Sequence, residues 1–347
     1  MVDLNNLEEI KRLDPQDTVG STEKLGQQMG AAWEQVQKVE VPQDYRDVSN
    51  IIFCGMGASI YGALVYKAIS GENNRYPTEY VSDYHLPKYV NSNSLVVLTS
   101  ASGTTEEVLS CAEEAKTKGA KMLVLTKGGP LGEFARQNNV PAYIYDGVLN
   151  PSGVPRLAIG YSIVGLLGLL SKAGICDVTD QDIKDALTVL NQKWNDIKQK
   201  ALTEVEKYNG KTPIVIAAEH LSGNAQILRN QFNETSKAFS AFYLVPDLNH
   251  HLMEGLAFPR PTNLVFIMLN SNNYSEKITK RMKLTSDVIM QNNHEVHSVN
   301  FETPTIYSDF FTTVVYGAYL TLFLGLLYDQ NPAINPYVDW FKKELSK

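Results

Sequence analysis

The chain has 347 residues, of which 44% are hydrophobic and 20% charged, and this composition excludes a disordered, collagen-like or long coiled-coil protein. The formal net charge of −7, with no block rich in Lys or Arg, argues against nucleic acid as the main partner. The 3 cysteines form no CxxC pair, so we expect free thiols and no disulfide framework or zinc site. At roughly 150 residues per domain, the length predicts about two domains.

The first segment with a clear pattern covers residues 4–40, whose apolar side chains recur at the spacing of an amphipathic helix. Leu25, Met29, Trp33 and Val36 fall on one face, so we expect helix with that face packed on the body of the protein. The N-terminus is acidic and lacks the apolar region of a secretory signal. We therefore expect a cytoplasmic protein.

After Pro42, predicted strands alternate with predicted helices, which is typical of an α/β fold with mainly parallel sheets. The strands of a first sheet are expected at 51–54, 79–81, 95–99, 121–126 and 142–145, and those of a second block at 213–218, 264–269 and 295–300. Helices are expected at 59–70, from the loop after residue 105 to 118, and at 155–173, 177–209, 224–236 and 277–291. Two blocks that each open with a strand and a polar loop indicate a structural duplication.

Residues 310–328 form an apolar stretch without a charged side chain, flanked by Asp309 and Asp329. Its threonines and glycines, and the absence of a basic flank, favour a buried helix over a membrane span. We expect no membrane partner; the sequence leaves open whether this helix serves the core or a subunit interface.

The first predicted strand runs into Gly55-Met56-Gly57-Ala58-Ser59, a glycine turn before a helix. Glycines let backbone N–H groups approach an anion, and a helix N-terminus adds positive potential. The dinucleotide fingerprint is excluded because its third glycine would fall on Ile60, and no P-loop motif occurs. On its own, this turn is equally consistent with a tight connection that binds nothing.

A stronger signal follows the strand at 95–99, where four hydroxyl side chains lie within six positions of a helix start: Ser100, Ser102, Thr104 and Thr105. Such a loop can surround a phosphate with neutral donors while the helix N-terminus supplies the field, so no lysine is needed. The alternative is a capping box of Thr104 with Glu107. We expect phosphate binding here.

With these motifs in place, the chain resembles the SIS (sugar isomerase) domain family, and most closely its bifunctional phosphoglucose/phosphomannose isomerases. The matching segments are GMGAS (55–59), SASGTTEE (100–107), GVPRLAIGY (153–161), NQFNETSKAF (230–239), PDLNHHLMEG (246–255) and the C-terminal run 319–345. The resemblance implies two SIS-type doubly wound domains at 46–175 and 211–347, joined by a helical connection at 176–210 and preceded by a helical extension at 1–45.

The resemblance also implies which residues bind a sugar phosphate, chiefly its phosphate: Gly57, Ser59, Ser100, Ser102 and Thr105. It implies four catalytic residues: Arg156 stabilises an enediolate, Glu234 moves a proton between C1 and C2, and His250 and Lys342 serve ring opening. In this family the histidine reaches the site from the partner subunit, so the resemblance implies a homodimer. The neighbours His251 and Lys343 remain competitors for the last two roles.

The chemistry of aldose–ketose isomerisation asks for the same residue types. A carboxylate whose pKa is raised by burial suits proton transfer next to a carbonyl, and a guanidinium suits the negative enediolate. A histidine suits acid–base opening of the sugar ring. We therefore expect no metal and no cofactor.

The expected activity is interconversion of glucose 6-phosphate or mannose 6-phosphate with fructose 6-phosphate, as used in glycolysis and gluconeogenesis. Two alternatives stay open. One is a non-catalytic SIS regulator that only binds a phosphosugar, and the other is an isomerase or epimerase of another sugar phosphate. The preference between glucose and mannose does not follow from the sequence.

Overall fold

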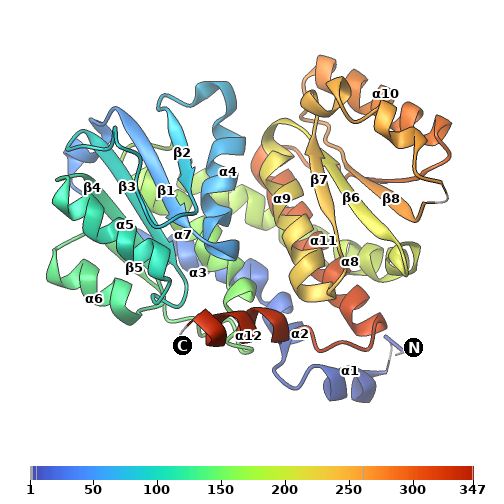
Figure 1. The fold of residues 1–347 in the computed structure, drawn as a ribbon, viewed down its shortest axis with the longest axis horizontal. Coiled ribbons are helices and arrows are strands. Elements are labelled where there is room, and N and C mark those ends of the chain that lie inside the picture. The colour runs from blue at the N-terminus through green and yellow to red at the C-terminus, as the bar shows by residue number, and fades with distance from the viewer. Residues whose placement is uncertain (1–2, 5, 261, 346) are drawn as a thin grey trace.

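The computed structural model describes residues 3–4, 6–260, 262–345 and 347. It shows two α/β lobes side by side, each built on a sheet in which every strand pair is parallel (Figure 1). This confirms the predicted α/β fold with two parallel sheets flanked by helices.

The first sheet has the strand order β2-β1-β3-β4-β5 and the second has the order β7-β6-β8-β9. Starting from its own first strand, the second sheet repeats the order of the first four strands of the other, as the predicted duplication requires. The strands are β1 (Asn50–Gly55), β2 (Thr78–Val81), β3 (Ser94–Ser100), β4 (Lys121–Thr126), β5 (Ala142–Ile144), β6 (Thr212–Ala217), β7 (Ala241–Leu244), β8 (Leu264–Leu269) and β9 (Glu295–Val299).

Helices follow the strands, and three more precede them. The helices are α1 (Leu7–Leu13), α2 (Thr18–Glu23), α3 (Leu25–Val36), α4 (Tyr61–Ser70), α5 (Glu106–Thr117), α6 (Gly129–Gln137), α7 (Ile159–Lys172), α8 (Asp180–Glu204), α9 (Ser222–Gln231), α10 (Glu276–Gln291), α11 (Ile306–Leu327) and α12 (Pro336–Leu345). Short 3-10 turns lie between them, and a π-helix, Phe232–Ser236, continues α9. α12 crosses beneath the two lobes in Figure 1.

The first sheet is covered on both faces, which explains why its strands are continuous apolar runs. Because successive side chains of a strand point to opposite faces, Ile52 and Cys54 join one apolar cluster with α5, whereas Ile51 and Phe53 join a second with α3, α4 and α7. That second cluster continues without interruption into the other lobe. One core therefore fixes the two sheets relative to each other.

The apolar stretch expected at 310–328 falls in helix α11, which is long and apolar enough to cross a membrane and is buried from Ser308 to Leu327. A helix that is apolar on all sides is typical of a core position, and α11 packs against α8 and α9. The structure thus places it in the core of the chain.

The predicted helical pattern at 4–40 resolves into α1, α2 and α3, and all four of the residues predicted to face the core from α3 are buried. The pattern did not predict α6 or β7. α6 begins with glycine and proline, and β7 is a four-residue edge strand whose side chains are all half-buried, so neither carries a strong periodic signal. The domain boundaries remain predictions.

The close approach of α4 to its neighbours joins the two halves. A Cβ on Gly62 would lie 2.7 Å from the Leu166 side chain of α7, and a Cβ on Gly223 of α9 would lie 2.9 Å from the Leu64 carbonyl oxygen. Only glycine permits these approaches, and they place α4 directly against α9.

Candidate active site

The predicted phosphate loop lies at the carboxyl end of β3, where it leads into α5. Ser100 Oγ lies 2.8 Å from Thr105 Oγ1 and accepts a hydrogen bond from the Gly103 N–H at 3.1 Å. Ser102 Oγ lies 2.9 Å from Thr104 Oγ1. The hydroxyls therefore form two pairs within one tight turn, and each can redirect a donor toward an anion.

Helix α5 begins without a side-chain cap, because its N-cap residue Thr105 makes no such hydrogen bond. Thr104 is hydrogen-bonded to Ser102 instead. The alternative of a capping box between Thr104 and Glu107 is therefore wrong. Because no N-cap side chain accepts from them, the first-turn N–H groups of α5 can donate to an external partner.

The glycine turn lies beside this loop because β1 and β3 are neighbouring strands. Gly57 has a φ of +54°, a conformation that glycine adopts without strain, and no atom lies within 4 Å of a Cβ placed there. Ser59 Oγ accepts a hydrogen bond from the Ala101 N–H at 3.2 Å, which ties the two loops together. The structure thus brings all five predicted phosphate-binding residues to adjoining loops at one edge of the first sheet.

Glu234 lies in the π-helix Phe232–Ser236, which continues α9 and widens the last turn before the chain reverses. Burial raises the pKa of its carboxyl group, and the charges of Arg156, Lys237 and Lys342 oppose that rise without cancelling it. A half-buried carboxyl group with a raised pKa has the property expected of a base in proton transfer near neutrality.

Arg156 comes from the first half of the chain and acts electrostatically on Glu234 of the second half. Burial lowers the pKa of its guanidinium, and the charge of Glu234 opposes that effect. Its Nη2 donates to the carbonyl oxygens of Pro332 and, at 2.9 Å, Ala333. Among the described residues, its buried Nε has no hydrogen-bond partner, so this donor remains available to a ligand.

Two further residues belong to this cluster and were not predicted as site residues: Lys237 and Asn335. Lys237 has a φ of +60° directly after the π-helix, and its Nζ donates to the Glu234 carbonyl oxygen at 2.5 Å. Burial lowers its pKa to about 8, and Arg156 contributes to that lowering. With its amide oriented to satisfy its neighbours, Asn335 accepts from Arg156 Nη1 at 3.0 Å and donates to the Glu234 carbonyl oxygen at 3.2 Å.

Of the two candidate lysines in α12, Lys342 is the one whose charge lowers the pKa of Glu234. Its side chain is exposed, and α12 has no buried residue among those that the structure describes. Lys342 is therefore within electrostatic reach of the base while remaining open to solvent.

The two candidate histidines lie apart from this cluster, in and just after the 3-10 turn Asp247–His250. Both are exposed. His251 Nε2 lies 3.4 Å from Asp247 Oδ2, whereas His250 has no side-chain partner among the described residues. Within one chain, the structure does not bring His250 to Glu234.

Within the described part of the chain, no group of three or more His, Cys, Asp or Glu side chains is placed to hold a metal ion. The cluster is instead made of a carboxyl group, a guanidinium, two ammonium groups and an amide. The absence of a metal from the reaction stays a prediction.

Comparisons with known proteins agree with the motifs. Residues 197–345 match the family described as the bacterial phospho-glucose isomerase C-terminal SIS domain. The chain is similar to this SIS-domain family over that segment. It is 29% identical over 345 residues to a bifunctional phosphoglucose/phosphomannose isomerase of Caldicellulosiruptor bescii, covering 94% of this chain and 98% of the relative. A protein of the same name from Aquifex aeolicus is 28% identical over 322 residues, covering 91% and 96%.

Solved structures support the SIS fold at lower identity. A hypothetical protein from Thermus thermophilus aligns with a TM-score of 0.71 at 18% identity, covering 98% of this chain and 93% of the other. The tagatose-6-phosphate ketose/aldose isomerase of Escherichia coli aligns with a TM-score of 0.62 at 16% identity, covering 94% and 95%. The resemblance to the SIS family is confirmed.

Proposed function

We propose that this protein is an aldose–ketose isomerase that interconverts glucose 6-phosphate or mannose 6-phosphate with fructose 6-phosphate. The observation that carries the proposal is the meeting of Glu234 with Arg156. Asn335 accepts from Arg156 Nη1 at 3.0 Å and donates to the Glu234 carbonyl oxygen at 3.2 Å, and the half-buried Glu234 carboxyl group has a raised pKa. Relatives named phosphoglucose/phosphomannose isomerase align with more than nine-tenths of this chain.

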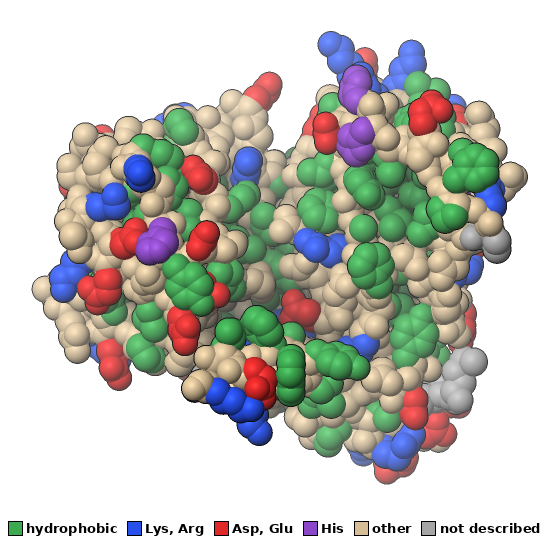
Figure 2. Space-filling view, viewed as in Figure 1, with side chains coloured by type: hydrophobic (Ala, Val, Ile, Leu, Met, Phe, Trp, Pro, Cys, Tyr) green, Lys and Arg blue, Asp and Glu red, His purple; other side chains and the backbone are tan. Residues whose placement is uncertain are grey.

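The phosphate of the substrate is bound by the serine/threonine loop, through Ser100, Ser102 and Thr105, with Gly57 and Ser59 on the adjoining turn. Neutral hydroxyls and the N-terminus of α5 supply the attraction, so a protein of net charge −7 can bind an anion locally. The surface is hollowed between the two lobes (Figure 2), which leaves space for a sugar.

Glu234 removes the proton from C2 of the open-chain aldose and returns it to C1. The proton of the C2 hydroxyl passes to O1, so that the C1 carbonyl becomes a hydroxyl and C2 becomes the carbonyl. The intermediate is a cis-enediolate, whose negative charge Arg156 stabilises through its N–H donors. No metal takes part in this scheme. Lys342 assists ring opening from the exposed helix α12.

His250 supplies the acid–base partner for ring opening from a second copy of the chain, since it lies exposed and away from Glu234 of its own chain. The functional unit is therefore a homodimer. Large apolar side chains are grouped on the surface of the second lobe and along α12 (Figure 2). Exposed apolar side chains of this lobe and of α12 include Phe239 at 73% exposure and Tyr337 at 87%, which a second subunit could cover. Light scattering with a concurrent assay tests this, and a fully active monomer would contradict it.

A coupled assay that detects fructose 6-phosphate, run with each aldose, tests the reaction. We expect turnover of at least one aldose, loss of turnover in Glu234→Gln, and unchanged turnover in the matched control Glu133→Gln on the exposed face of α6. A folded wild-type protein that binds sugar phosphate and turns over neither aldose would instead support a non-catalytic regulator.

A second candidate rests on a specific comparison. A D-glucosamine-6-phosphate 4-epimerase of Sulfolobus acidocaldarius is 24% identical over 249 residues of alignment, covering 70% of this chain. An amino sugar phosphate is therefore the next substrate to test, and activity on it together with failure on all three hexose phosphates would favour this alternative. For either enzyme we propose a cytoplasmic location, which subcellular fractionation tests.

A further inference from the structure

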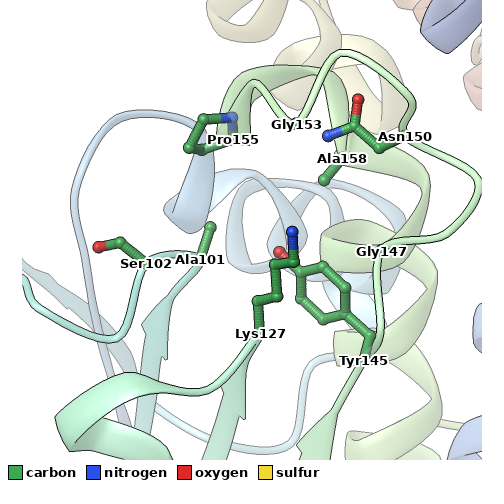
Figure 3. A pocket seen from close by; sticks show the side chains of 9 residues that line it. All are labelled: Ala101, Ser102, Lys127, Tyr145, Gly147, Asn150, Gly153, Pro155 and Ala158. Atoms are coloured by element: carbon green, nitrogen blue, oxygen red, sulfur yellow. The ribbon is translucent and has the colours of Figure 1, made fainter.

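A cavity of about 210 Å³ adjoins the serine/threonine loop, and Ser102 is the one residue of its lining that the mechanism above uses. Its walls come from the carboxyl ends of β4 and β5 and from the 150–158 loop (Figure 3). Lys127 directly follows β4, and Tyr145 directly follows β5. Ala101 and Ser102 form the side shared with the phosphate loop.

Lys127 is the single charged side chain among the residues that line this cavity. Figure 3 shows its ammonium group directed into the space between Tyr145, Asn150 and Ala158. Among the described residues, none forms a hydrogen bond or an ion pair with that ammonium group. Lys127 is exposed on its solvent side, and its ammonium group beside a concave pocket, with no carboxylate to neutralise it, attracts anions.

Tyr145 adds a second donor to the cavity. Its side chain is only 2% exposed, and none of the described residues hydrogen-bonds its hydroxyl. Burial raises the pKa of the phenol, so the hydroxyl keeps its proton and donates. Asn150 differs, because its Nδ2 donates to the Val154 carbonyl oxygen at 2.9 Å and its Oδ1 accepts from Ser152 at 2.8 Å. The two unpartnered groups of the cavity are therefore both donors.

The cavity is joined to the phosphate loop through the backbone. The Lys127 N–H donates to the Ala101 carbonyl oxygen at 3.2 Å, and the Ala101 N–H donates to Ser59 Oγ at 3.2 Å. The peptide groups of Ala101 thus contact the glycine turn on one side and the lysine on the other. The backbone of Lys127 is therefore held next to the phosphate loop.

We propose that this cavity is a second anion-binding site, distinct from the serine/threonine loop, in which Lys127 and Tyr145 bind a phosphate or carboxylate group. The anion is either a free one or the second acidic group of a sugar phosphate that carries two. The site adjoins the position assigned to the substrate phosphate, so the inference deepens the proposed function. The case in which the anion belongs to a sugar phosphate rests on that proposed function.

Inorganic phosphate provides the first test, with binding followed by ³¹P NMR and calorimetry and folding checked by circular dichroism. We expect two phosphates per wild-type subunit, one in Lys127→Met, and one in the double variant Ser100→Ala/Thr105→Val. The control Lys116→Met removes an exposed lysine of α5 and should keep both. A single wild-type site that persists in Lys127→Met overturns the inference. This readout needs no turnover, so failure of the proposed isomerase activity is seen separately.

Fructose 1,6-bisphosphate and glucose 6-phosphate distinguish the two sources of the anion. If the second acidic group of the ligand occupies the cavity, Lys127→Met weakens binding of the bisphosphate by about 30-fold, as expected for a lost charge-assisted hydrogen bond. Binding of glucose 6-phosphate should then weaken by less than about threefold. If the bisphosphate is unaffected while the phosphate count falls to one, the occupant is a free anion. Equal weakening of both sugars, with the phosphate count unchanged, would make Lys127 part of the substrate site and overturn the proposal.

Discussion

The two sheets end in loops at equivalent positions, but the loops of the first present hydrogen-bond donors and those of the second carry a carboxylate. After β1 and β3 of the first sheet, the loops present hydroxyls and the N-terminus of α5, which no N-cap side chain occupies. After β6 and β8 of the second, the Glu219 carboxylate accepts from the Ser275 N–H at 3.1 Å and from its hydroxyl at 2.6 Å, where α10 begins. The second sheet carries its own anion at the position where the first can receive one.

Asp309 of α11 is a second carboxylate at the carboxyl end of the second sheet. Its carboxylate lies 3.0 Å from His220 Nε2 and accepts from Asn273 at 2.8 Å, from Thr303 at 2.6 Å and from Ser271. Burial raises the pKa of Asp309, and these hydrogen bonds outweigh burial and hold the pKa below its usual value. On our proposal the loops of the first sheet bind the substrate phosphate, whereas the hydrogen-bonded Asp309 gives the equivalent end of the second sheet a structural role.

The largest effect is expected from Asp309→Asn, which removes the buried charge that four neighbours donate to. We expect the free energy of unfolding at pH 7 to fall by about 3 kcal/mol, measured by urea denaturation, because the donors lose their charged acceptor. The exposed neighbour variant Asp329→Asn should stay within about 0.5 kcal/mol. Equal stability of the two variants would refute a structural role for the second edge.

The same substitution has a pH signature. The pKa of Asp309 is lower in the folded protein than the usual value of about 3.9, so the unfolded chain binds more protons as the pH falls. The stabilisation is complete above that usual value and is lost as the pH falls through the folded pKa. The wild type should therefore lose stability in acid more steeply than Asp309→Asn.

Gly103→Ala tests the first edge. Gly103 has a φ of +71°, and a Cβ there would lie 1.9 Å from the Gly128 carbonyl oxygen, so the phosphate loop must shift. We expect sugar phosphate binding, measured by calorimetry, to weaken by about 30-fold, or roughly 2 kcal/mol. Gly119→Ala is the matched control, since its φ is +66° but nothing lies within 4 Å of the added Cβ. Equal affinities in both variants would mean that the shape of this loop does not matter for binding.

Glu219→Gln tests the built-in anion of the second edge. Removing the negative charge at the N-terminus of α10 should lower the free energy of unfolding by about 1 kcal/mol and leave KM unchanged. Glu276→Gln, in the first turn of the same helix, is the control because its carboxylate makes no side-chain hydrogen bond among the described residues, and about 0.3 kcal/mol is expected. A rise in KM for Glu219→Gln alone would show that the second edge takes part in binding.

The sequence was sufficient for the parts of the molecule that local patterns encode. The strands β4 and β8 match the predicted bounds residue for residue, because apolar runs bounded by polar turns carry a strong signal. The serine/threonine loop was visible because its hydroxyls are close in sequence. The resemblance supplied Glu234 and Arg156, which no periodic pattern would have distinguished from surface residues.

What could not be predicted depends on contacts between distant segments. Lys237 joins the site because a left-handed residue ends the π-helix, and its position beside Asn335 arises only when residues 332–335 return past Arg156. The one available signal was the lysine three residues after the glutamate in NETSK. Glu219 was equally hidden, since its partner Ser275 lies 56 residues away.

The smallest effect is expected from Lys237, and it should appear in the pH profile of kcat. Burial, together with the charge of Arg156, places the pKa of Lys237 near 8, and its ammonium in turn lowers that of Glu234. Above that pH the ammonium group loses its charge, the enediolate loses a stabilising neighbour, and kcat should fall. The groups that face Lys237 are Glu234, Arg156 and the neutral amide of Asn335.

Three proteins make the test quantitative. Wild type should show an alkaline limb near pH 8. Lys237→Arg should lack that limb because arginine keeps its charge. Lys237→Met should also lack it, and its kcat should be lower by about threefold, or ~0.7 kcal/mol. In Lys237→Met the acid limb should move to higher pH, because the pKa of Glu234 rises further when a positive neighbour is removed. A purely structural lysine would lower kcat equally at every pH, and the alkaline limb of the arginine variant would then match that of the wild type.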